Sequence, residues 1–359
     1  MGVQFVFPLV FQLPSAYNKS EKTNHTKPEV CFGFFCVQKA RENEEYRERG
    51  IIFDPQERMN MSVEATATNT NWLDEFKAIT KMRLALSVVF SSIAGYLLAA
   101  ETINYTDLTL LVIGGYCLVG ASNAFNQVIE KDLDALMQRT RNRPLPAGRM
   151  SSFTALTIAL GMSVTGIGLL YLLNWRAAFF GSVSILLYVM LYTPLKTKTP
   201  LAVFVGAFPG AIPFMLGWVA YTNYFGIEPG ILFMLQFFWQ FPHFWAIAWM
   251  LDEDYKKAGF KMLPTGKKDQ GTAFQIIVYT LWMILISLLP FTHYTGALQL
   301  SLFGAIAVSL VGLVMLYFAG NLMQKRDDQS ARRLMLSSVF YISVVQVIYV
   351  MDKFLVYGN

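Results

Sequence analysis

Long charge-free blocks of apolar residues follow one another along the chain from residue 72 onward. They occupy residues 84–100, 108–129, 150–175, 177–195, 199–227, 229–251 and 334–351. A further uncharged interval, 270–324, is long enough for two spans with a turn near residues 291–299. About 20 apolar residues in a helix cross the hydrocarbon of a bilayer. The pattern therefore predicts an all-α membrane protein, a bundle of nine transmembrane helices.

The connections between these blocks alternate in charge, and the alternation predicts an orientation. Bases precede the first block and recur in every second connection: Lys131, Arg139, Arg141, Arg143, Arg149, Lys196, Lys198, Lys256, Lys257, Lys261, Lys267, Lys268, Lys325, Arg326, Arg332 and Arg333. The other connections are nearly free of bases. Because loops rich in Lys and Arg stay in the cytoplasm, we expect a cytoplasmic N-terminus and a C-terminus outside.

The composition of the chain agrees with a membrane protein, and the first 70 residues differ in character from the rest. The chain is 54% apolar and only 15% charged, which is unlike an ordinary soluble domain. The opening MGVQFVFPLVFQLP lacks the basic region that a secretory signal peptide has. Four glutamates occur within residues 42–48, whereas a mitochondrial transit peptide is poor in acids. We interpret residues 1–70 as a poorly structured leader outside the working protein, and residues 71–359 as the membrane domain.

A first group of acids lies where the second span ends. Asn126, Glu130 and Asp134 are spaced i, i+4 and i+8, so they share one face of a continuous helix and rise about 6 Å per step. Carboxylates so close repel each other unless a cation lies between them. Mg²⁺ accepts such oxygens and fills its other positions with phosphate and water. The alternative is a solvated, charge-rich helix end.

A second group of acids ends the sixth span, where Asp252, Glu253 and Asp254 precede Lys256 and Lys257. Both groups fall on the predicted cytoplasmic side. Two acid-tipped helices that face each other would form one polar mouth. The residues alone thus predict a site for a divalent cation and a diphosphate; the resemblance described below implies Glu130, Asp134, Asp254 and Asp252 as its candidate metal ligands.

The neighbouring bases and one histidine each have two interpretations. Arg139 and Arg143 are four residues apart, and guanidinium suits bidentate phosphate contacts. These two arginines and Lys196 also fit the charge bias of cytoplasmic loops. His243 lies in mid-span after Pro242, which predicts a kink. It is either a hydrogen-bonded packing residue or a contact or ligand for a haem-like macrocycle.

Four longer stretches resemble the signatures of UbiA-type intramembrane prenyltransferases, specifically their haem-modifying members. They are NQVIEKDLDALMQRTRNRPLPAG (126–148), YTPLKTKTP (192–200), GAFPGAIPFMLGW (206–218) and WQFPHFWAIAWMLDEDYKKAGFKMLP (239–264). The resemblance runs from about residue 72 to the C-terminus. One departure is Glu130, where the family usually has aspartate. The small residues of 206–218 suit either close helix contact or a lipid tail.

The resemblance implies transfer of a farnesyl group from farnesyl diphosphate to a vinyl group of haem B, giving haem O, with Mg²⁺ as cofactor. It implies Asp134, Glu130 and Asp254 as catalytic residues, and as substrate-binding residues Asn126, Arg139, Arg143, Lys196, His243 and Tyr255. It further implies a bacterial inner-membrane protein surrounded by lipid, with its active site on the cytoplasmic side. An association with a haem A synthase or a terminal oxidase assembly is also implied.

Three other functions fit part of the pattern. A prenyltransferase that acts on a quinone precursor or a chlorophyll-like acceptor would share the acid groups but would not need His243. A transporter would place its polar residues along a path through the membrane, whereas these acids gather at one edge. A haem chaperone would have no use for the acids.

Overall fold

The computed structural model describes residues 71–357, and within that range the regular structure is helical throughout. The predicted leader (residues 1–70) lies outside the described residues. The described part contains nine helical segments long and apolar enough to cross a membrane, which confirms the predicted bundle. They are Met82–Ala99, Tyr105–Ile129, Ser152–Leu173, Trp175–Leu195, Ala202–Thr222, Ile227–Met250, Gln270–Thr292, Leu302–Lys325 and Asp328–Tyr357. The orientation of the two ends stays a prediction.

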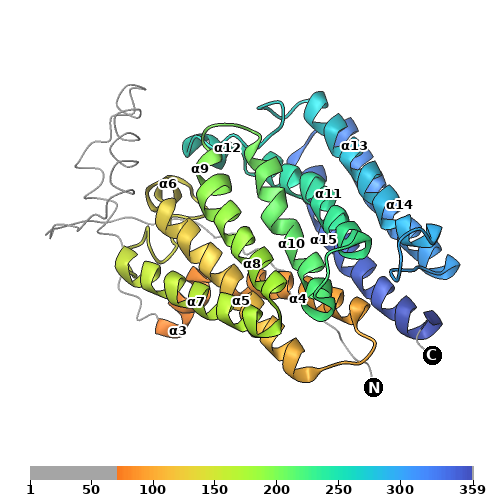
Figure 1. The fold of residues 1–359 in the computed structure, drawn as a ribbon. Helices are drawn as coiled ribbons and strands as arrows, with labels where there is room; N and C mark the ends of the chain where they lie inside the picture. The colour runs from red at the N-terminus through yellow and green to blue at the C-terminus, as the bar shows by residue number, and fades with distance from the viewer. Residues whose placement is uncertain (1–70, 358–359) are drawn as a thin grey trace, which may run out of the picture. The chain divides into compact units, whose positions relative to one another are not determined.

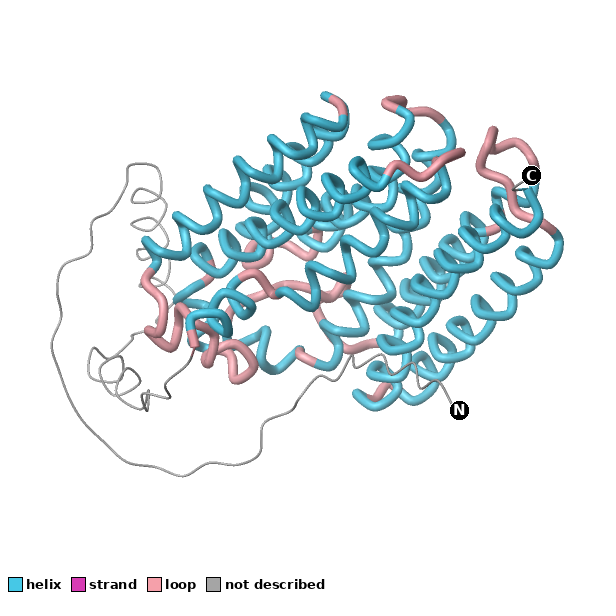
Figure 2. The backbone as a smooth tube through the Cα atoms, turned by 90° about the horizontal axis from the view of Figure 1, so that it is seen from below, coloured by secondary structure: helices cyan, strands magenta, loops and turns pink. Residues whose placement is uncertain are grey.

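Helices α10 (Ala202–Thr222) and α11 (Ile227–Met250) pack against each other and are the two most buried spans. One group of helices contacts α10: α4 (Met82–Ala99), α5 (Tyr105–Ile129), α7 (Ser152–Leu173) and α8 (Trp175–Leu186). Beyond α11 lie α13 (Gln270–Ser287), α14 (Leu302–Lys325) and α15 (Asp328–Asp352). Figure 1 shows this order, from α7 on one side to α14 on the other, and Figure 2 shows the bundle of helices from below.

Close helix packing explains the small residues of 206–218. A Cβ atom on Gly217 would lie 1.9 Å from the backbone oxygen of Ser92 on α4, and one on Gly95 would lie 2.0 Å from that of Phe214. The two backbones therefore touch, as small residues allow in membrane helices. Of the two interpretations for this stretch, close contact is the one that the structure supports.

The fourth span is not a uniform α-helix. After α8 the backbone continues as a π-helix, Leu187–Tyr192, and then as a single turn, α9 (Thr193–Leu195). A π segment within a helix shifts the following side chains around the axis, and such segments are frequent at functional sites. Here the shift affects the YTPLK stretch that ends at Lys196.

Three short helices lie at one end of the bundle, which we call the acid-bearing end because Glu130, Asp134 and Asp254 are there. They are α3 (Trp72–Ile79), α6 (Lys131–Leu136) and α12 (Asp252–Lys257). Figure 1 shows α6, α9 and α12 close together at this end, away from the C-terminus.

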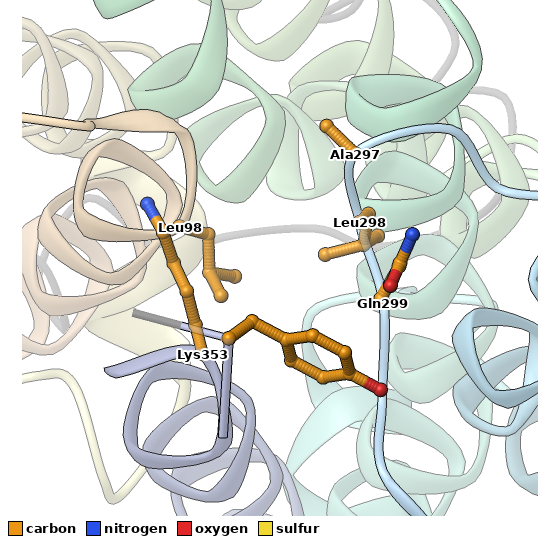
Figure 3. Close-up of a pocket in the computed structure, with 6 residues that line it drawn as sticks. Leu98, Ala297, Leu298, Gln299 and Lys353 are labelled. Carbon is orange, nitrogen blue, oxygen red and sulfur yellow. The ribbon is translucent and has the colours of Figure 1, made fainter. Parts of the chain in front are cut away.

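The opposite end of the bundle contains a cavity of about 210 Å³. It is lined by Leu98, Ala297, Leu298, Gln299, Lys353 and Tyr357. The Lys353 ammonium donates to the carbonyls of Leu97 and Ala100, at 3.0 and 2.6 Å, and so caps the C-terminal end of α4. Figure 3 shows the polar ends of Lys353 and Gln299 on opposite sides of the cavity.

Candidate active site

Glu130 stands at a break in the helix that the sequence predicts to be continuous. Helix α5 ends at Ile129, Glu130 has φ −92° and ψ 10°, and α6 starts at Lys131. A backbone hydrogen bond of 2.7 Å from the amide of Asp134 to the Glu130 carbonyl joins the two helices. The break turns the buried Glu130 carboxylate toward the fourth span, where its Oε1 lies 2.8 Å from Nζ of Lys196.

Asp134 is fully buried and forms a second ion pair. Its Oδ2 accepts a hydrogen bond of 2.6 Å from the guanidinium of Arg143. Its backbone carbonyl accepts one of 2.8 Å from the hydroxyl of Thr140, which ties the loop after α6 to the helix. The other carboxylate oxygen, Oδ1, is buried with no hydrogen-bond partner among the described residues. That oxygen is available to a cation.

The π-helix brings the fourth span to the acids. The side-chain amide of Asn126 donates to Oγ1 of Thr193 at 3.3 Å, and the Thr193 hydroxyl donates to the Tyr188 carbonyl at 2.9 Å. One turn later, the Lys196 ammonium lies 4.6 Å from the centre of the Tyr192 ring. Thr193 and Tyr192 therefore belong to the site, although the sequence analysis assigned no role to either.

The loop after α12 completes the surroundings of Lys196. Its ammonium lies 5.7 Å from the ring centre of Phe260, which packs edge-on against Tyr255 with ring centres 5.7 Å apart. Burial would lower the pKa of Lys196, but the charge and hydrogen bond of Glu130 outweigh it, so the pKa lies above its usual value. Lys196 therefore stays a cation.

Asp254 joins the second acid group to the first. Its two carboxylate oxygens accept hydrogen bonds of 3.1 Å each from the backbone amides of Gln138 and Arg139. Lys257 donates a third, also of 3.1 Å. Burial would raise the pKa of Asp254, but these three hydrogen bonds outweigh it and hold the pKa below its usual range. The second acid group thus contacts the loop that follows the first, because Asp254 holds the turn that leads to Arg143.

Three of the predicted site residues take no part in the pairs Glu130–Lys196 and Asp134–Arg143. Asp252 turns toward its own helix, where it pairs with Lys256 at 2.9 Å. The side chain of Arg139 is exposed, and only its backbone contacts Asp254. His243 lies in the middle of α11 and faces α15.

The hydrogen bonds of His243 fix which ring nitrogen is free. Its Nδ1 lies 2.8 Å from Oγ of Ser338, whose own proton is donated to the Met335 carbonyl at 2.7 Å. The hydroxyl has a single proton, so Nδ1 must carry a proton and donate it to Ser338. In that tautomer Nε2 has a free lone pair. The ring stacks on Trp239, with centres 4.7 Å apart.

Lys81, which the sequence analysis treated only as part of the charge bias, lies directly before the first span. It connects α3 to α4 and has left-handed backbone angles, φ 47° and ψ 54°. Burial, followed by the charges of Arg143 and Lys196, lowers its pKa well below the usual value, against the smaller effects of Asp134 and Glu130. In the sequence, this lysine is marked only by its position directly before the first span.

The carboxylates suit a hard cation that shares its coordination with a ligand. Residues 71–357 contain no group of three acidic, histidine or cysteine side chains arranged to hold a metal ion, so one cage of Glu130, Asp134, Asp252 and Asp254 is absent. Two neighbouring carboxylates are present, and Oδ1 of Asp134 lacks a partner. Mg²⁺ typically binds through one or two carboxylates together with substrate phosphates, and these residues fit that mode.

The comparisons with known proteins show the family of the chain. The model of the UbiA prenyltransferase family matches residues 88–345. The chain belongs to this family, and the predicted class of enzyme is confirmed.

The similar curated proteins share one name. The protoheme IX farnesyltransferase of Christiangramia forsetii is 62% identical over 283 residues, which cover 79% of this chain and 94% of that protein. The protein of the same name from Flavobacterium johnsoniae is 57% identical over 300 residues, covering 83% of this chain and all of that protein.

Solved structures at low identity share the fold. A UbiA homologue from Aeropyrum pernix K1 has a TM-score of 0.62 at 17% identity, covering 74% of this chain and 98% of its own. A homologue from Archaeoglobus fulgidus bound to GPP and Mg²⁺ has a TM-score of 0.55 at 12% identity, covering 77% of this chain and 99% of its own. The UbiA-like architecture is therefore confirmed, and the chain is an integral, multi-pass membrane protein.

Proposed function

We propose that the protein transfers the farnesyl group of farnesyl diphosphate to a vinyl group of haem B and so produces haem O. The observation that carries this proposal is the identity of 57–62% with proteins named protoheme IX farnesyltransferase, along nearly their whole length. The buried acid–base group described above is the second support, because it provides what cleavage of an allylic diphosphate requires.

Lys196 and Arg143 would stabilise the leaving diphosphate, and Arg139 would reach it from the surface. Lys196 and Arg143 each hold a carboxylate at under 3 Å, and Arg139 stands exposed at the mouth. When the bond between the farnesyl carbon and the diphosphate oxygen breaks, negative charge develops on the diphosphate. Fixed cations directed at that charge stabilise the transition state. Asn126, Thr193 and Tyr192 hold Lys196 in the required place.

Glu130 and Asp134 would hold Mg²⁺. Asp254 would support this site by holding the loop after α6, and Asp252 would lie at the edge of the site. A bound Mg²⁺ neutralises the phosphate oxygens and acts as a Lewis acid toward the leaving group. The chain's own contribution is to keep both carboxylates buried and close to Lys196 and Arg143. Burial also excludes water from the allylic cation until it meets its acceptor.

The acceptor haem would lie beside His243. The free lone pair of Nε2 suits contact with haem iron, since imidazole is a usual axial ligand. The new bond joins the first farnesyl carbon to the outer vinyl carbon. The diphosphate has by then left with the electron pair of the broken carbon–oxygen bond. Water adds to the inner vinyl carbon, where the positive charge has moved, and releases a proton. The iron changes no oxidation state, so haem is a substrate, and a haem A synthase or terminal oxidase assembly would take up the product.

Mass spectrometry of extracted haems tests this function. Membranes that contain the protein are incubated with haem B, farnesyl diphosphate and Mg²⁺, and we expect the farnesylated, hydrated haem. Replacement of farnesyl diphosphate by geranylgeranyl diphosphate, and of haem by a quinone precursor, tests the substrates. Prenylation of the quinone precursor with unchanged haem would refute the proposal.

His243→Ala tests the haem contact separately. We expect the KM for haem to rise about tenfold, the effect of losing one good contact, while the KM for farnesyl diphosphate stays the same. Trp239→Phe, which keeps the stacking on the ring, serves as the control. An equal loss for both substrates would make His243 a packing residue.

A further inference from the structure

The buried face of the short helix α3 carries an acid. Its two buried residues, Glu75 and Ile79, are four apart and share one face. Ile79 belongs to the same buried apolar cluster as Leu145 and Met150, from the segment between α6 and α7. The Oε2 atom of Glu75 is buried without a hydrogen-bond partner among the described residues. Burying a carboxylate is costly, so its presence on this face indicates that it is used.

Arg149 connects Glu75 to the loop that carries Arg143. Its Nε donates to Oε1 of Glu75 at 2.7 Å, and that carboxylate is only 9% exposed. Its Nη2 donates to the carbonyl of Asn142 at 2.9 Å. The rigid fork of a guanidinium suits such a double contact. One side chain thus joins α3 to the residue directly before Arg143.

The peptide group between Asn142 and Arg143 is held on both of its sides. The carbonyl of Asn142 and the amide of Arg143 belong to one planar unit. The carbonyl accepts from Arg149, and the amide donates to the carbonyl of Thr140 at 2.9 Å. Pro144 restricts the backbone of the residue before it. The direction in which the Arg143 side chain leaves the backbone is therefore set.

We propose that Glu75 is a positioning residue of the diphosphate site, which acts through Arg149 to keep the guanidinium of Arg143 directed at the leaving diphosphate. This inference rests on the proposed function and deepens it. Asp254 holds the first part of the same loop through the amides of residues 138 and 139. Helix α3 holds the last part, so the loop is fixed from two separate segments of the chain.

Glu75→Met separates positioning from general stability. Methionine favours a helix, and an apolar side chain in place of a buried charge is often neutral or stabilising. The side chain of Arg149 is 28% exposed, so water reaches it once its partner is gone. We expect the melting temperature in detergent to stay the same or to rise.

The kinetics of Glu75→Met should change in the opposite sense. We expect kcat/KM for farnesyl diphosphate to fall about tenfold, because a small displacement of a charge-stabilising group suffices for such a loss. The KM for haem should not change. A role in stability alone would instead lower the melting temperature and affect both substrates.

A double-mutant cycle tests the route through Arg143. Arg143→Met should lower kcat/KM about a hundredfold, as the loss of one charge-stabilising donor does. Adding Glu75→Met should cause no further fall, because residues that act through one contact are not additive.

Arg149→Lys tests the connecting side chain and remains informative if Glu75→Met folds poorly. Lysine keeps the positive charge beside Glu75 but lacks the planar fork. We expect a melting temperature near that of the wild type, together with a fall in kcat/KM for farnesyl diphosphate about as large as that of Glu75→Met.

The pair between Lys268 and Asp328 offers a matched control. It has the same length, 2.7 Å, its lysine side chain is 25% exposed, and it too joins two distant segments, the connection before α13 and the start of α15. We expect Asp328→Asn to leave kcat/KM for farnesyl diphosphate unchanged. An equal loss in this variant would make the pair of Glu75 and Arg149 an ordinary structural contact.

Two further results would overturn the inference. One is a tenfold fall on adding Glu75→Met to Arg143→Met, and the other is a folded Glu75→Met variant with wild-type kinetics. If instead the wild-type protein makes no farnesylated haem, the proposed function fails. Binding of inorganic diphosphate with Mg²⁺, measured by calorimetry across the same variants, then still tests the role of Glu75.

Discussion

The two acid groups look alike in the sequence, since each ends a span and is followed by bases, but they differ in the folded protein. Glu130 and Asp134 are both buried. Glu130 pairs with Lys196, which is distant in the chain, and Asp134 pairs with Arg143 in the loop that follows α6. Asp252 instead pairs with a lysine of its own short helix. Asp254 uses its oxygens to hold the backbone of the loop that carries Arg143.

The difference teaches that the origin of the partners, rather than the number of acids or their burial, separates the two groups, since Asp252 is buried as well. A carboxylate buried against a distant cation keeps a strong, poorly screened interaction. A pair within one helix whose lysine is largely exposed contributes little. We therefore expect the first group to act on the substrate and the second to keep the loops in place.

The largest expected effect follows removal of the first group's buried charge. Asp134→Asn keeps the size of the side chain but leaves Arg143 without its anion and removes one candidate metal ligand. We expect haem O formation to fall about a thousandfold, as when a charge-stabilising group is lost from an active site. The measurement is the amount of haem O formed by purified protein in detergent, with tryptophan fluorescence to verify folding. Turnover near the wild-type rate would remove Asp134 from the mechanism.

A smaller effect is expected for Asp254→Asn. An asparagine oxygen can accept from one of the backbone amides of Gln138 and Arg139, but not from both. The loop should loosen, and we expect haem O formation to fall about tenfold, in keeping with the loss of one hydrogen bond to a charged group. Titration with Mg²⁺ indicates the role: an unchanged apparent affinity fits a support, whereas a large loss would make Asp254 a metal ligand.

The pH dependence of stability should come partly from Asp254. Because its pKa is lowered in the folded state, its stabilising effect is complete above the unfolded pKa of about 4 and is lost as the pH falls through the folded value. We expect the melting temperature of the wild-type protein to fall toward that of Asp254→Asn as the medium is acidified below about pH 4. Parallel curves for the two proteins at all pH values would contradict this assignment.

The smallest effect is expected for Asp252→Asn. Its partner Lys256 is largely exposed, and such pairs contribute little. We expect turnover and melting temperature to stay within about twofold and a few degrees of wild type. A loss as complete as that of Asp134→Asn would place Asp252 among the metal ligands and would end the contrast between the two groups.

The sequence by itself determined the membrane class, the number of spans and the expectation that both acid groups lie at the same end of the bundle. It could do so because about 20 uncharged apolar residues have few alternatives to a spanning helix, and because acids at a span's end are costly without a use. The family signatures added the class of reaction.

Only the tertiary structure decided how the site is assembled. The break at Glu130, the π-helix before Lys196 and the left-handed Lys81 each turn a side chain by an angle that local spacing does not specify. The pairing of Glu130 with Lys196, and of Asp254 with the amides of residues 138 and 139, joins segments 66 to 116 positions apart. Such contacts depend on how nine helices pack together, and a linear pattern contains no record of that packing.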